Sequence, residues 1–479
     1  MRRVVLPLPL ILLAAGMPLL SGVPAAAIPT GSRDVIVQLF QWNWASVARE
    51  CSDVLGPRGY GGVQISPPQE HVVLPEKGYP WWQDYQPVSY RLDNTRRGDR
   101  AALSSMIATC HAAGVKVYVD AVINHMTGGA SSGPGSAGSS YSHYDYPGTY
   151  QSQDFHHCGR NGNDDIVNYN DRYEVQNCEL VDLADLATGS DYVRGRIAGY
   201  LNELIGLGVD GFRVDGAKHI PATDLAAIKS RLSKPVYLYQ EVIYGAGEPI
   251  TPDEYTGNGD VLEFRYGTDL AKIFNNERLA NLRTFGSPLP SDRAVVFTDN
   301  HDTQRGTGVL TFRDNGRYAL ANAFMLGWTY GTPKVMSSYE FSSPDQGPPS
   351  IGDGRTADTT CFSAGWRCEH RWPVIANMVG FHNAVRGTGV ADWWDNGNDT
   401  IAFSRGAKGY LILNDEGSAV NGRRFHTSLP AGSYCDVFHG DFIGGSCTGP
   451  AYTVDSAGWF RADIAAQDGL ALHVEARVS

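Results

Sequence analysis

The sequence has no C-x-x-C spacing among its eight cysteines, which argues against a structural zinc site or a dithiol redox centre. No second long hydrophobic run follows the first 27 residues, so nothing later in the chain predicts a membrane span. Positive charge is in deficit, because 39 lysines and arginines face 51 aspartates and glutamates, for a net charge of -12. That deficit argues against nucleic acid or an anionic membrane as the main partner. With 42% apolar residues, the rest is the composition of an ordinary globular protein.

The first 27 residues are interpreted as a secretory signal peptide. Arg2 and Arg3 form its positively charged start, an apolar run follows, and the alanines at 25–27 suit a cleavage site. The alternative is a transmembrane anchor, but prolines at positions 7, 9, 18 and 24 interrupt the run. We therefore expect a secreted, extracellular protein with no membrane attachment after signal removal.

The eight cysteines predict a disulfide framework, because their number is even and the chain is expected to be exported. They follow one another in neighbouring pairs, and sequential pairing is the simplest framework. The predicted bonds are Cys51 with Cys110, Cys158 with Cys178, Cys361 with Cys368, and Cys435 with Cys447.

Eight short apolar runs recur along the chain, and helical patterns such as 100–114 and 191–208 lie between several of them. This alternation predicts a parallel sheet, and the number of runs predicts a closed (β/α)8 barrel. The runs are 34–42, 60–68, 115–125, 209–215, 235–243, 260–266, 294–302 and 333–341.

Two regions interrupt the alternation. Residues 125–187 are rich in glycine, serine, asparagine and tyrosine and read as a loop-rich inserted domain after the third strand, with 131–140 as a mobile loop. From 386 to 479, short alternating runs separated by turns predict a C-terminal antiparallel β-sandwich. The barrel would then comprise 28–124 and 188–385.

Acidic residues end several of the predicted strands: Asp120, Asp215, Glu241 and Asp302. In a barrel of this kind, active sites lie at the carboxyl ends of the strands. Any single carboxylate is more often a surface charge or a helix cap, but several at matching strand ends make coincidence a poor explanation. Glycoside hydrolysis needs one ionised and one protonated carboxyl group. Arg213, two residues before Asp215 on the same strand face, would favour the ionised form of Asp215, and Glu241 in apolar surroundings would be the protonated group.

Four segments carry a resemblance to a known family: DAVINH (120–125), GFRVDGAKH (211–219), QEVI (240–243) and FTDNHD (297–302). In order and spacing they resemble the signature segments of the α-amylase family of glycoside hydrolases, and most closely its animal-type, chloride-dependent group. PWWQDYQP, NYND and CEHRW also resemble segments of that group. The resemblance covers nearly all of the mature chain. It implies a secreted enzyme that hydrolyses internal α-1,4 bonds of starch, glycogen and related glucans.

The resemblance also implies roles for individual residues. Asp215 would be the nucleophile, Glu241 the general acid and base, and Asp302 the residue that stabilises the transition state, with retention of anomeric configuration. The residues implied to bind sugar are Trp81, Trp82, Tyr85, His125, Tyr169, Lys218, His219, Glu248 and His301. Without the resemblance, His125 and His301 would more often be packed structural residues, and the Trp-Trp pair could equally pack against the insert.

Calcium is implied by the match of Asn124, Asp185 and the backbone carbonyl of His219 to the oxygen ligands of the family. Gln176 occupies the position of a fourth ligand, where animal members usually have an arginine that offers its backbone carbonyl. Without the resemblance, Asp185 would pass for an ordinary residue at a helix start.

Chloride is implied by Arg213 and Asn300, which match two of the three residues around the anion. The third position holds Lys334, where animal members have arginine. Lysine keeps the charge but loses the bidentate fork, so weaker anion binding is expected. Alternatively, Lys334 only caps the eighth strand and no anion binds. Further departures are the lack of one disulfide common in animal members and a short 306–312 segment in place of their glycine-rich loop.

Other functions remain open at this point. A transglycosylase or a maltogenic enzyme of the same superfamily would share these motifs, and a non-catalytic glucan-binding barrel would usually have lost one of the three acids. The expected partners are starch, glycogen and malto-oligosaccharides, together with proteinaceous amylase inhibitors. The expected state is a monomer, and the sequence shows no further C-terminal starch-binding module.

Overall fold

Eight short parallel strands close into a barrel in the order β1-β12-β11-β10-β9-β8-β3-β2. The computed structural model describes residues 33–129 and 131–478, so the predicted signal peptide lies outside the described residues. Each barrel strand overlaps one of the eight predicted runs, which confirms the (β/α)8 prediction. The strands are β1 (Ile36–Leu39), β2 (Gly62–Ile65), β3 (Lys116–Ala121), β8 (Gly211–Val214), β9 (Tyr237–Gln240), β10 (Asp260–Leu262), β11 (Ala294–Val296) and β12 (Thr332–Ser337).

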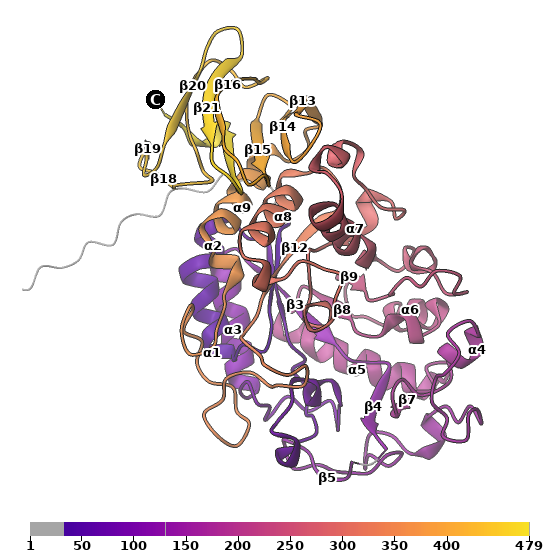
Figure 1. The fold of residues 1–479 in the computed structure, drawn as a ribbon. Helices are drawn as coiled ribbons and strands as arrows, with labels where there is room; N and C mark the ends of the chain where they lie inside the picture. The colour runs from indigo at the N-terminus through magenta and orange to yellow at the C-terminus, as the bar shows by residue number, and fades with distance from the viewer. Residues whose placement is uncertain (1–32, 130, 479) are drawn as a thin grey trace, which may run out of the picture.

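Helices surround the barrel, and residues at their ends account for where they stop and start (Figure 1). The Asp99 carboxylate accepts the Ala102 N–H and so caps the start of α3, whereas Gly208, at φ 109°, ends α5 in the left-handed region that glycine favours. The helices are α1 (Trp44–Glu50), α2 (Gly56–Arg58), α3 (Arg100–Ala112), α5 (Asp191–Leu207), α6 (Ala222–Lys229), α7 (Phe264–Asn276), α8 (Gly316–Gly327) and α9 (Pro373–Val385).

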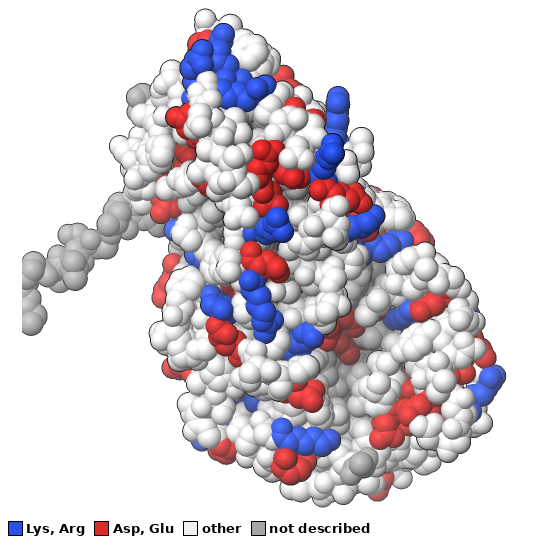
Figure 2. Space-filling view, viewed as in Figure 1, with Lys and Arg blue, Asp and Glu red and all other residues white. Residues whose placement is uncertain are grey.

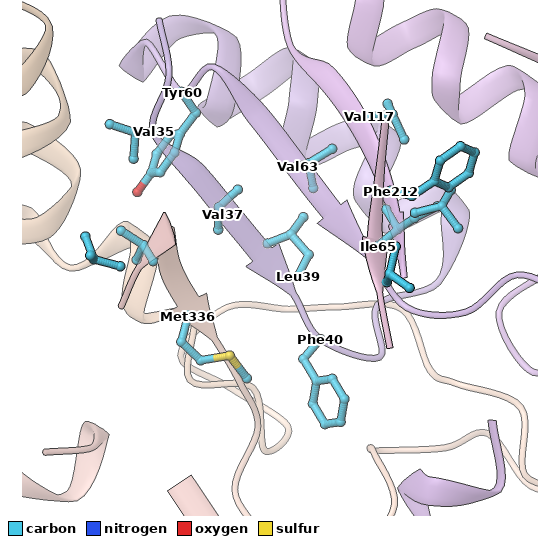
Figure 3. Close-up of a cluster of buried hydrophobic side chains, with 14 of the residues drawn as sticks. Val35, Val37, Leu39, Phe40, Tyr60, Val63, Ile65, Val117, Phe212 and Met336 are labelled. Carbon is cyan, nitrogen blue, oxygen red and sulfur yellow. The ribbon is translucent and has the colours of Figure 1, made fainter. Parts of the chain in front are cut away.

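Alternate side chains of each barrel strand point to opposite faces. Val37 and Leu39 of β1 and Val63 of β2 belong to the large apolar cluster drawn in Figure 3. Side chains of the other face meet inside the barrel: the Tyr239 hydroxyl of β9 donates to Gln64 Oε1 of β2 at 3.0 Å, although β9 and β2 are not neighbouring strands. The barrel interior therefore contains a polar layer, and the functional side chains rise from it.

The insert lies at one end of the barrel and the C-terminal strands project from the other (Figure 1). The insert holds two small antiparallel sheets, β4 (His125–Gly128) with β7 (Leu183–Asp185) and β5 (Gly133–Pro134) with β6 (Ser140–Tyr141), and the short helix α4 (Arg172–Val175). The segment 131–140, expected to be a mobile loop, contains β5 and the first residue of β6. The buried carboxylate of Glu70 accepts the backbone N–H groups of Ala137 and Ser139, both at 2.9 Å, and so ties this segment to the barrel.

The C-terminal strands form the predicted antiparallel sandwich. A four-stranded sheet, β13-β14-β15-β22, faces the smaller sheets β16-β21 and β20-β17-β23. Aromatic side chains fill the space between them, with the rings of Tyr410 and Phe460 5.4 Å apart. The strands are β13 (Val390–Asp395), β14 (Thr400–Arg405), β15 (Gly409–Asn414), β16 (Val420–His426), β17 (Gly432–Cys435), β18 (Phe442–Ile443), β19 (Ser446–Cys447), β20 (Ala451–Val454), β21 (Trp459–Ile464), β22 (Asp468–His473) and β23 (Arg477–Val478).

All four predicted disulfides are present, and within the described residues no cysteine is left unpaired. Over 33–129 and 131–478, no helix is both long enough and apolar enough to cross a membrane.

Candidate active site

The three predicted catalytic carboxylates meet in one hollow of about 470 Å³. Asp215 follows β8, Glu241 follows β9, and Asp302 lies in the loop after β11, so the carboxyl ends of three strands bring them together. The space-filling view shows a hollow between the barrel loops and the insert (Figure 2). Every residue predicted to bind sugar also lines this hollow: Trp81, Trp82, Tyr85, His125, Tyr169, Lys218, His219, Glu248 and His301.

One guanidinium group holds three acids at the floor of the hollow. Arg213 Nη1 donates to Asp120 Oδ1 at 2.6 Å and also to Asp215, while Nη2 donates to Glu241. The Arg213 side chain is 2% exposed, and the side chains of Asp215 and Glu241 are 12% and 11% exposed. Asp302 differs, since its side chain is 42% exposed. The predicted alignment of Arg213 with Asp215 is therefore confirmed, and Asp120 joins them.

Arg213 acts on Asp215 in the predicted direction, because its positive charge lowers the pKa of the Asp215 carboxyl group and so favours the ionised form. Burial raises the pKa of Asp215 well above its usual value, and although Arg213 acts in the opposite direction, the negative charges of Glu241 and Asp120 add to the rise. Arg213 thus opposes the effect of burial on Asp215, and it does so while it is also bonded to Asp120 and Glu241.

The surroundings of Glu241 differ from the prediction. Apolar contacts were expected, but its carboxylate accepts from Arg213 and from the backbone N–H of Gly216, the latter at 2.9 Å. Gly216 can present this N–H because its φ of 54° turns the chain sharply after β8. The carboxylate is therefore held in a fixed position by two polar donors.

Two of the three histidines that line the hollow, His125 and His301, are buried neutral groups. Burial lowers the pKa of His125 to about 4, and its Nε2 lies 2.9 Å from the carbonyl oxygen of Tyr85. Burial likewise lowers the pKa of His301 well below its usual value, and its ring stacks on Tyr85 at 5.3 Å. Near neutral pH both rings can exchange hydrogen bonds with a hydroxyl group but add no positive charge.

Trp81 and Trp82 begin a short 3₁₀ helix (Trp81–Tyr85) at the rim. Their indole N–H groups donate to the Pro344 carbonyl at 2.8 Å and to Asp345 Oδ1 at 3.1 Å. The pair is thus anchored to the segment after β12, and these bonds do not support the alternative of a pair anchored by the insert. Tyr85 is 8% exposed and donates its hydroxyl to Asp120 at 2.8 Å, so it supports the acid cluster as well as lining the hollow.

Lys218, Glu248 and Tyr169 form another part of the wall of the hollow. Lys218 Nζ pairs with Glu248, donates to the Ile243 carbonyl at 2.8 Å and lies 5.5 Å from the centroid of the Tyr169 ring. Lining residues that the sequence reasoning missed are Leu180, Val181, Leu183, Ile243 and Tyr244. Most are apolar and carry no motif, so the one available signal was their position next to predicted site residues.

Comparison with known proteins agrees with this geometry. Residues 65–237 match the α-amylase catalytic domain, and residues 391–475 match the α-amylase C-terminal all-beta domain. An α-amylase of Thermomonospora curvata is 58% identical over 95% of this chain and 75% of its own, and one of the beetle Tenebrio molitor is 47% identical over 93% and 98%. The chain belongs to the α-amylase family.

Structural comparison leads to the same family. Wild-type α-amylase I of Eisenia fetida superimposes with a TM-score of 0.88 at 41% identity, covering 93% of this chain and 98% of that one. A mutant of the same earthworm enzyme, solved as a maltohexaose complex, superimposes equally well. The protein is accordingly a glycoside hydrolase that hydrolyses starch.

The predicted calcium ligands lie where the insert meets the barrel. Asn124 and Asp185 are both 1% exposed, and His125 pairs with Asp185 across the β4-β7 sheet. Asp185 Oδ2 lies 2.6 Å from His156 Nδ1, but its Oδ1 is buried with no hydrogen-bond partner. Burial raises the pKa of Asp185 to about 6. A buried carboxylate oxygen without a partner is what a missing cation would leave, so these residues fit calcium.

A different group of potential ligands lies within the insert. Donor atoms of His143, Glu179 and Asp182 lie within 4.8 Å of one another. Glu179 is already satisfied by His143 Nε2 at 2.8 Å and by the Tyr144 hydroxyl at 2.6 Å. One hydrogen bond, between His143 and Glu179, joins two members of the group, and the group is separate from the predicted calcium ligands.

Lys334 lies inside the barrel and does not cap its strand from outside. Its side chain is 2% exposed and Nζ donates to Gln38 Oε1 at 2.6 Å. Burial, with the charge of Arg213 next in importance, lowers the pKa of Lys334 to about 7. Asn300 Oδ1 accepts the backbone N–H groups of Asp302 and Thr303, at 3.0 and 2.8 Å, which leaves its Nδ2 group as the donor that an anion would use.

Proposed function

We propose that the enzyme cleaves internal α-1,4 bonds of starch, glycogen and related glucans with retention of anomeric configuration. The observation that carries the proposal is that Asp215 and Glu241 bind neighbouring nitrogens of one guanidinium group in a single hollow. That arrangement favours the short separation of about 5–5.5 Å typical of retaining glycosidases over the roughly 6.5–9.5 Å of inverting ones.

In this proposal Asp215 attacks the anomeric carbon while Glu241 donates its proton to the leaving glycosidic oxygen. The C–O bond to the leaving chain breaks and a covalent bond to Asp215 forms. Glu241, now ionised, takes a proton from water, which attacks the same carbon and releases Asp215. Asp302, more exposed than the other two acids, is free to contact sugar hydroxyls and stabilise the transition state.

The walls of the hollow would hold the glucan. Trp81 and Trp82 offer anchored rings for stacking, and the neutral rings of His125 and His301 offer hydrogen bonds. The remaining substrate contacts would come from Tyr85, Tyr169, Lys218, His219 and Glu248, which line the same hollow.

Two ions are part of the proposal. Asn124 and Asp185 would hold calcium through their side chains, and Gln176 and His219 through their backbone carbonyls. When bound, calcium supplies a cross-link between insert and barrel and no step of the reaction. Arg213, Asn300 and Lys334 would hold chloride close to the acid cluster. The positive charges of Arg213 and Lys334 in the barrel interior support this assignment.

Secretion and the domain limits are also proposed. The signal peptide would be 1–27, the barrel 28–124 and 188–385, the insert 125–187 and the C-terminal domain 386–479. The four disulfides are consistent with export. The partners would be starch, glycogen and malto-oligosaccharides, with proteinaceous inhibitors as further partners of a monomeric enzyme.

The catalytic roles are tested with Asp215→Asn and Glu241→Gln on soluble starch. Each variant should remain folded and should lose at least about 10⁴-fold in kcat. NMR of the fresh products should show the α-anomer, and starch viscosity should fall before much reducing sugar appears. Activity retained by Asp215→Asn would contradict the nucleophile assignment, and predominant transfer to added glucose acceptors would indicate a transglycosylase.

The calcium assignment is tested without an activity assay. Chelator should lower the melting temperature of the wild-type enzyme and should have no effect on Asp185→Ala, which lacks the buried carboxylate. Asp182→Ala is the matched control, because it removes an acidic residue of the insert outside the predicted ligand set. Equal responses of all three proteins to chelator would refute the assignment.

A further inference from the structure

Tyr244 is an exposed aromatic residue in the active-site hollow that has no role in the proposed reaction. It follows Glu241 by three residues and lines the same hollow as the catalytic acids, yet 39% of its surface is exposed. Ile243 beside it also lines the hollow and is 45% exposed. Together they leave apolar surface at the mouth of a cleft, where a ligand can cover it.

The Tyr244 ring is positioned in advance. The guanidinium carbon of Arg265 lies 4.4 Å from the ring centroid. Arg265 is itself held by two bonds to Glu263, from Nε at 2.8 Å and from Nη2 at 2.6 Å. Glu263 is 1% exposed and its carboxylate also caps α7 by accepting the Arg265 N–H. Arg265 therefore connects the Tyr244 ring to the buried Glu263 at the start of α7.

The backbone beneath the ring is fixed as well. Lys218 Nζ donates to the Ile243 carbonyl at 2.8 Å and pairs with Glu248. These contacts tie both sides of Tyr244 to the 3₁₀ turn after β8. A ring whose position is already set loses little conformational entropy when a ligand stacks on it.

Tyr244 lies at the end of the cleft away from the tryptophans. A second hollow, of about 720 Å³, continues from Trp82 and Tyr85 along the insert. Among the described residues that line it, neither Ile243 nor Tyr244 is present. Since Tyr244 shares its loop with Glu241, it lies on the side where the general acid would meet the leaving chain.

We propose that Tyr244 forms a further glucose subsite on the leaving-group side, where its free face stacks on one unit of a long α-1,4-glucan. This inference rests on the proposed roles of Asp215 and Glu241. The subsite would favour long chains over short ones, and it would bias cleavage toward bonds that leave several glucose units on the leaving side.

The test compares Tyr244→Ala and Tyr244→Phe on end-labelled maltoheptaose and on nitrophenyl maltotrioside, whose leaving group is a single ring. For Tyr244→Ala, kcat/KM on maltoheptaose should fall by roughly fivefold to tenfold, the loss expected for one aromatic contact. The cleavage sites should also shift toward bonds with fewer units on the leaving side. Activity on the short substrate should not change, and Tyr244→Phe should behave as wild type because it keeps the ring.

Two further variants separate stacking from general damage. Arg265→Met keeps the ring but removes its support, so it should lose roughly twofold to fivefold on maltoheptaose only. Tyr173→Ala removes another exposed tyrosine that lies beside an arginine but outside both hollows, and it should change nothing. An unchanged cleavage pattern in Tyr244→Ala would overturn the subsite while starch hydrolysis by the wild type still supports the proposed function. An equal loss on both substrates would also overturn it.

Discussion

Replacement of Arg213 by methionine tests the electrostatics of the active site most directly. Arg213 is buried and bonds to Asp120, Asp215 and Glu241, so the variant leaves three carboxylates without their cation. Removal of one partner from a buried ion pair costs about 3–5 kcal/mol. The acids can respond by taking up protons, and this limits the loss to about that range.

The expected change in melting temperature follows from the size of the chain. At about 2.1 cal/mol/K per residue, unfolding of 479 residues carries an entropy of roughly 1 kcal/mol/K. The melting temperature of Arg213→Met should therefore fall by about 3–5 °C near pH 7. Arg194→Met is the matched control, because its pair with Asp224 is partly exposed and its loss should cost about 1 kcal/mol or less.

The dependence on pH distinguishes this reasoning from simple loss of packing. Burial already raises the pKa values of Asp120 and Asp215 in the folded enzyme, and loss of Arg213 should raise them further. When the pKa of an acid is higher in the folded than in the unfolded protein, that acid destabilises the folded protein as the pH rises above its unfolded pKa of about 3.9. In calorimetry, the difference in melting temperature between Arg213→Met and the wild type should be small near pH 4 and should widen toward pH 8. A gap that stays constant across this range would refute the electrostatic account.

Three other predictions concern separate parts of the molecule. After dialysis into chloride-free buffer, Lys334→Arg should be activated at lower NaCl concentrations than the wild type, since arginine restores a bidentate fork, and Lys334→Met should not be activated. If added NaCl changes the activity of neither variant nor of the wild type, the result would count against the anion site. His439 has its pKa raised to about 10, first by its bond to Asp436 and then by Asp468, so His439→Gln should lower the melting temperature at pH 6 but not above pH 10; an equal loss at both would disprove this reasoning. Removal of the Cys51–Cys110 bond, which closes 59 residues, should cost roughly 2 kcal/mol more than removal of Cys361–Cys368, which closes 7, and equal denaturation midpoints would argue against a chain-entropy origin.

The barrel could be predicted from the sequence because the pattern that marks each strand lies within a few consecutive residues. Each strand is a short apolar run, and strand alternation alone places Arg213 and Asp215 on one face. The carboxyl ends of parallel strands then bring Glu241 and Asp302 to the same edge, as the shared hollow confirms. Cysteine order was sufficient for the disulfides because the simplest pairing is the one present.

Contacts between distant segments could not be predicted in the same way. Glu70 holds the backbone of Ala137 and Ser139, more than sixty residues away, and glycine-rich composition gives no hint of that anchor. Trp82 meets Asp345 across 263 positions. The polar surroundings of Glu241 likewise depend on Arg213 of the neighbouring strand and on a turn at Gly216, although the residues that flank Glu241 in sequence are apolar.

The chemistry of the cleft follows from an imbalance of charge in the barrel interior. The acids Asp120, Asp215 and Glu241 share one guanidinium group. The nearby Lys334 binds its own proton only weakly, because burial lowers its pKa to about 7. Carboxylates outnumber firm positive charges, so the cluster favours keeping a proton near neutral pH. A retaining glycosidase needs just that state, with one acid protonated and its neighbour ionised. A chloride ion beside Arg213 and Lys334 would add negative charge and hold the shared proton to higher pH. Anion binding would therefore extend activity on the alkaline side and leave the acid side unchanged.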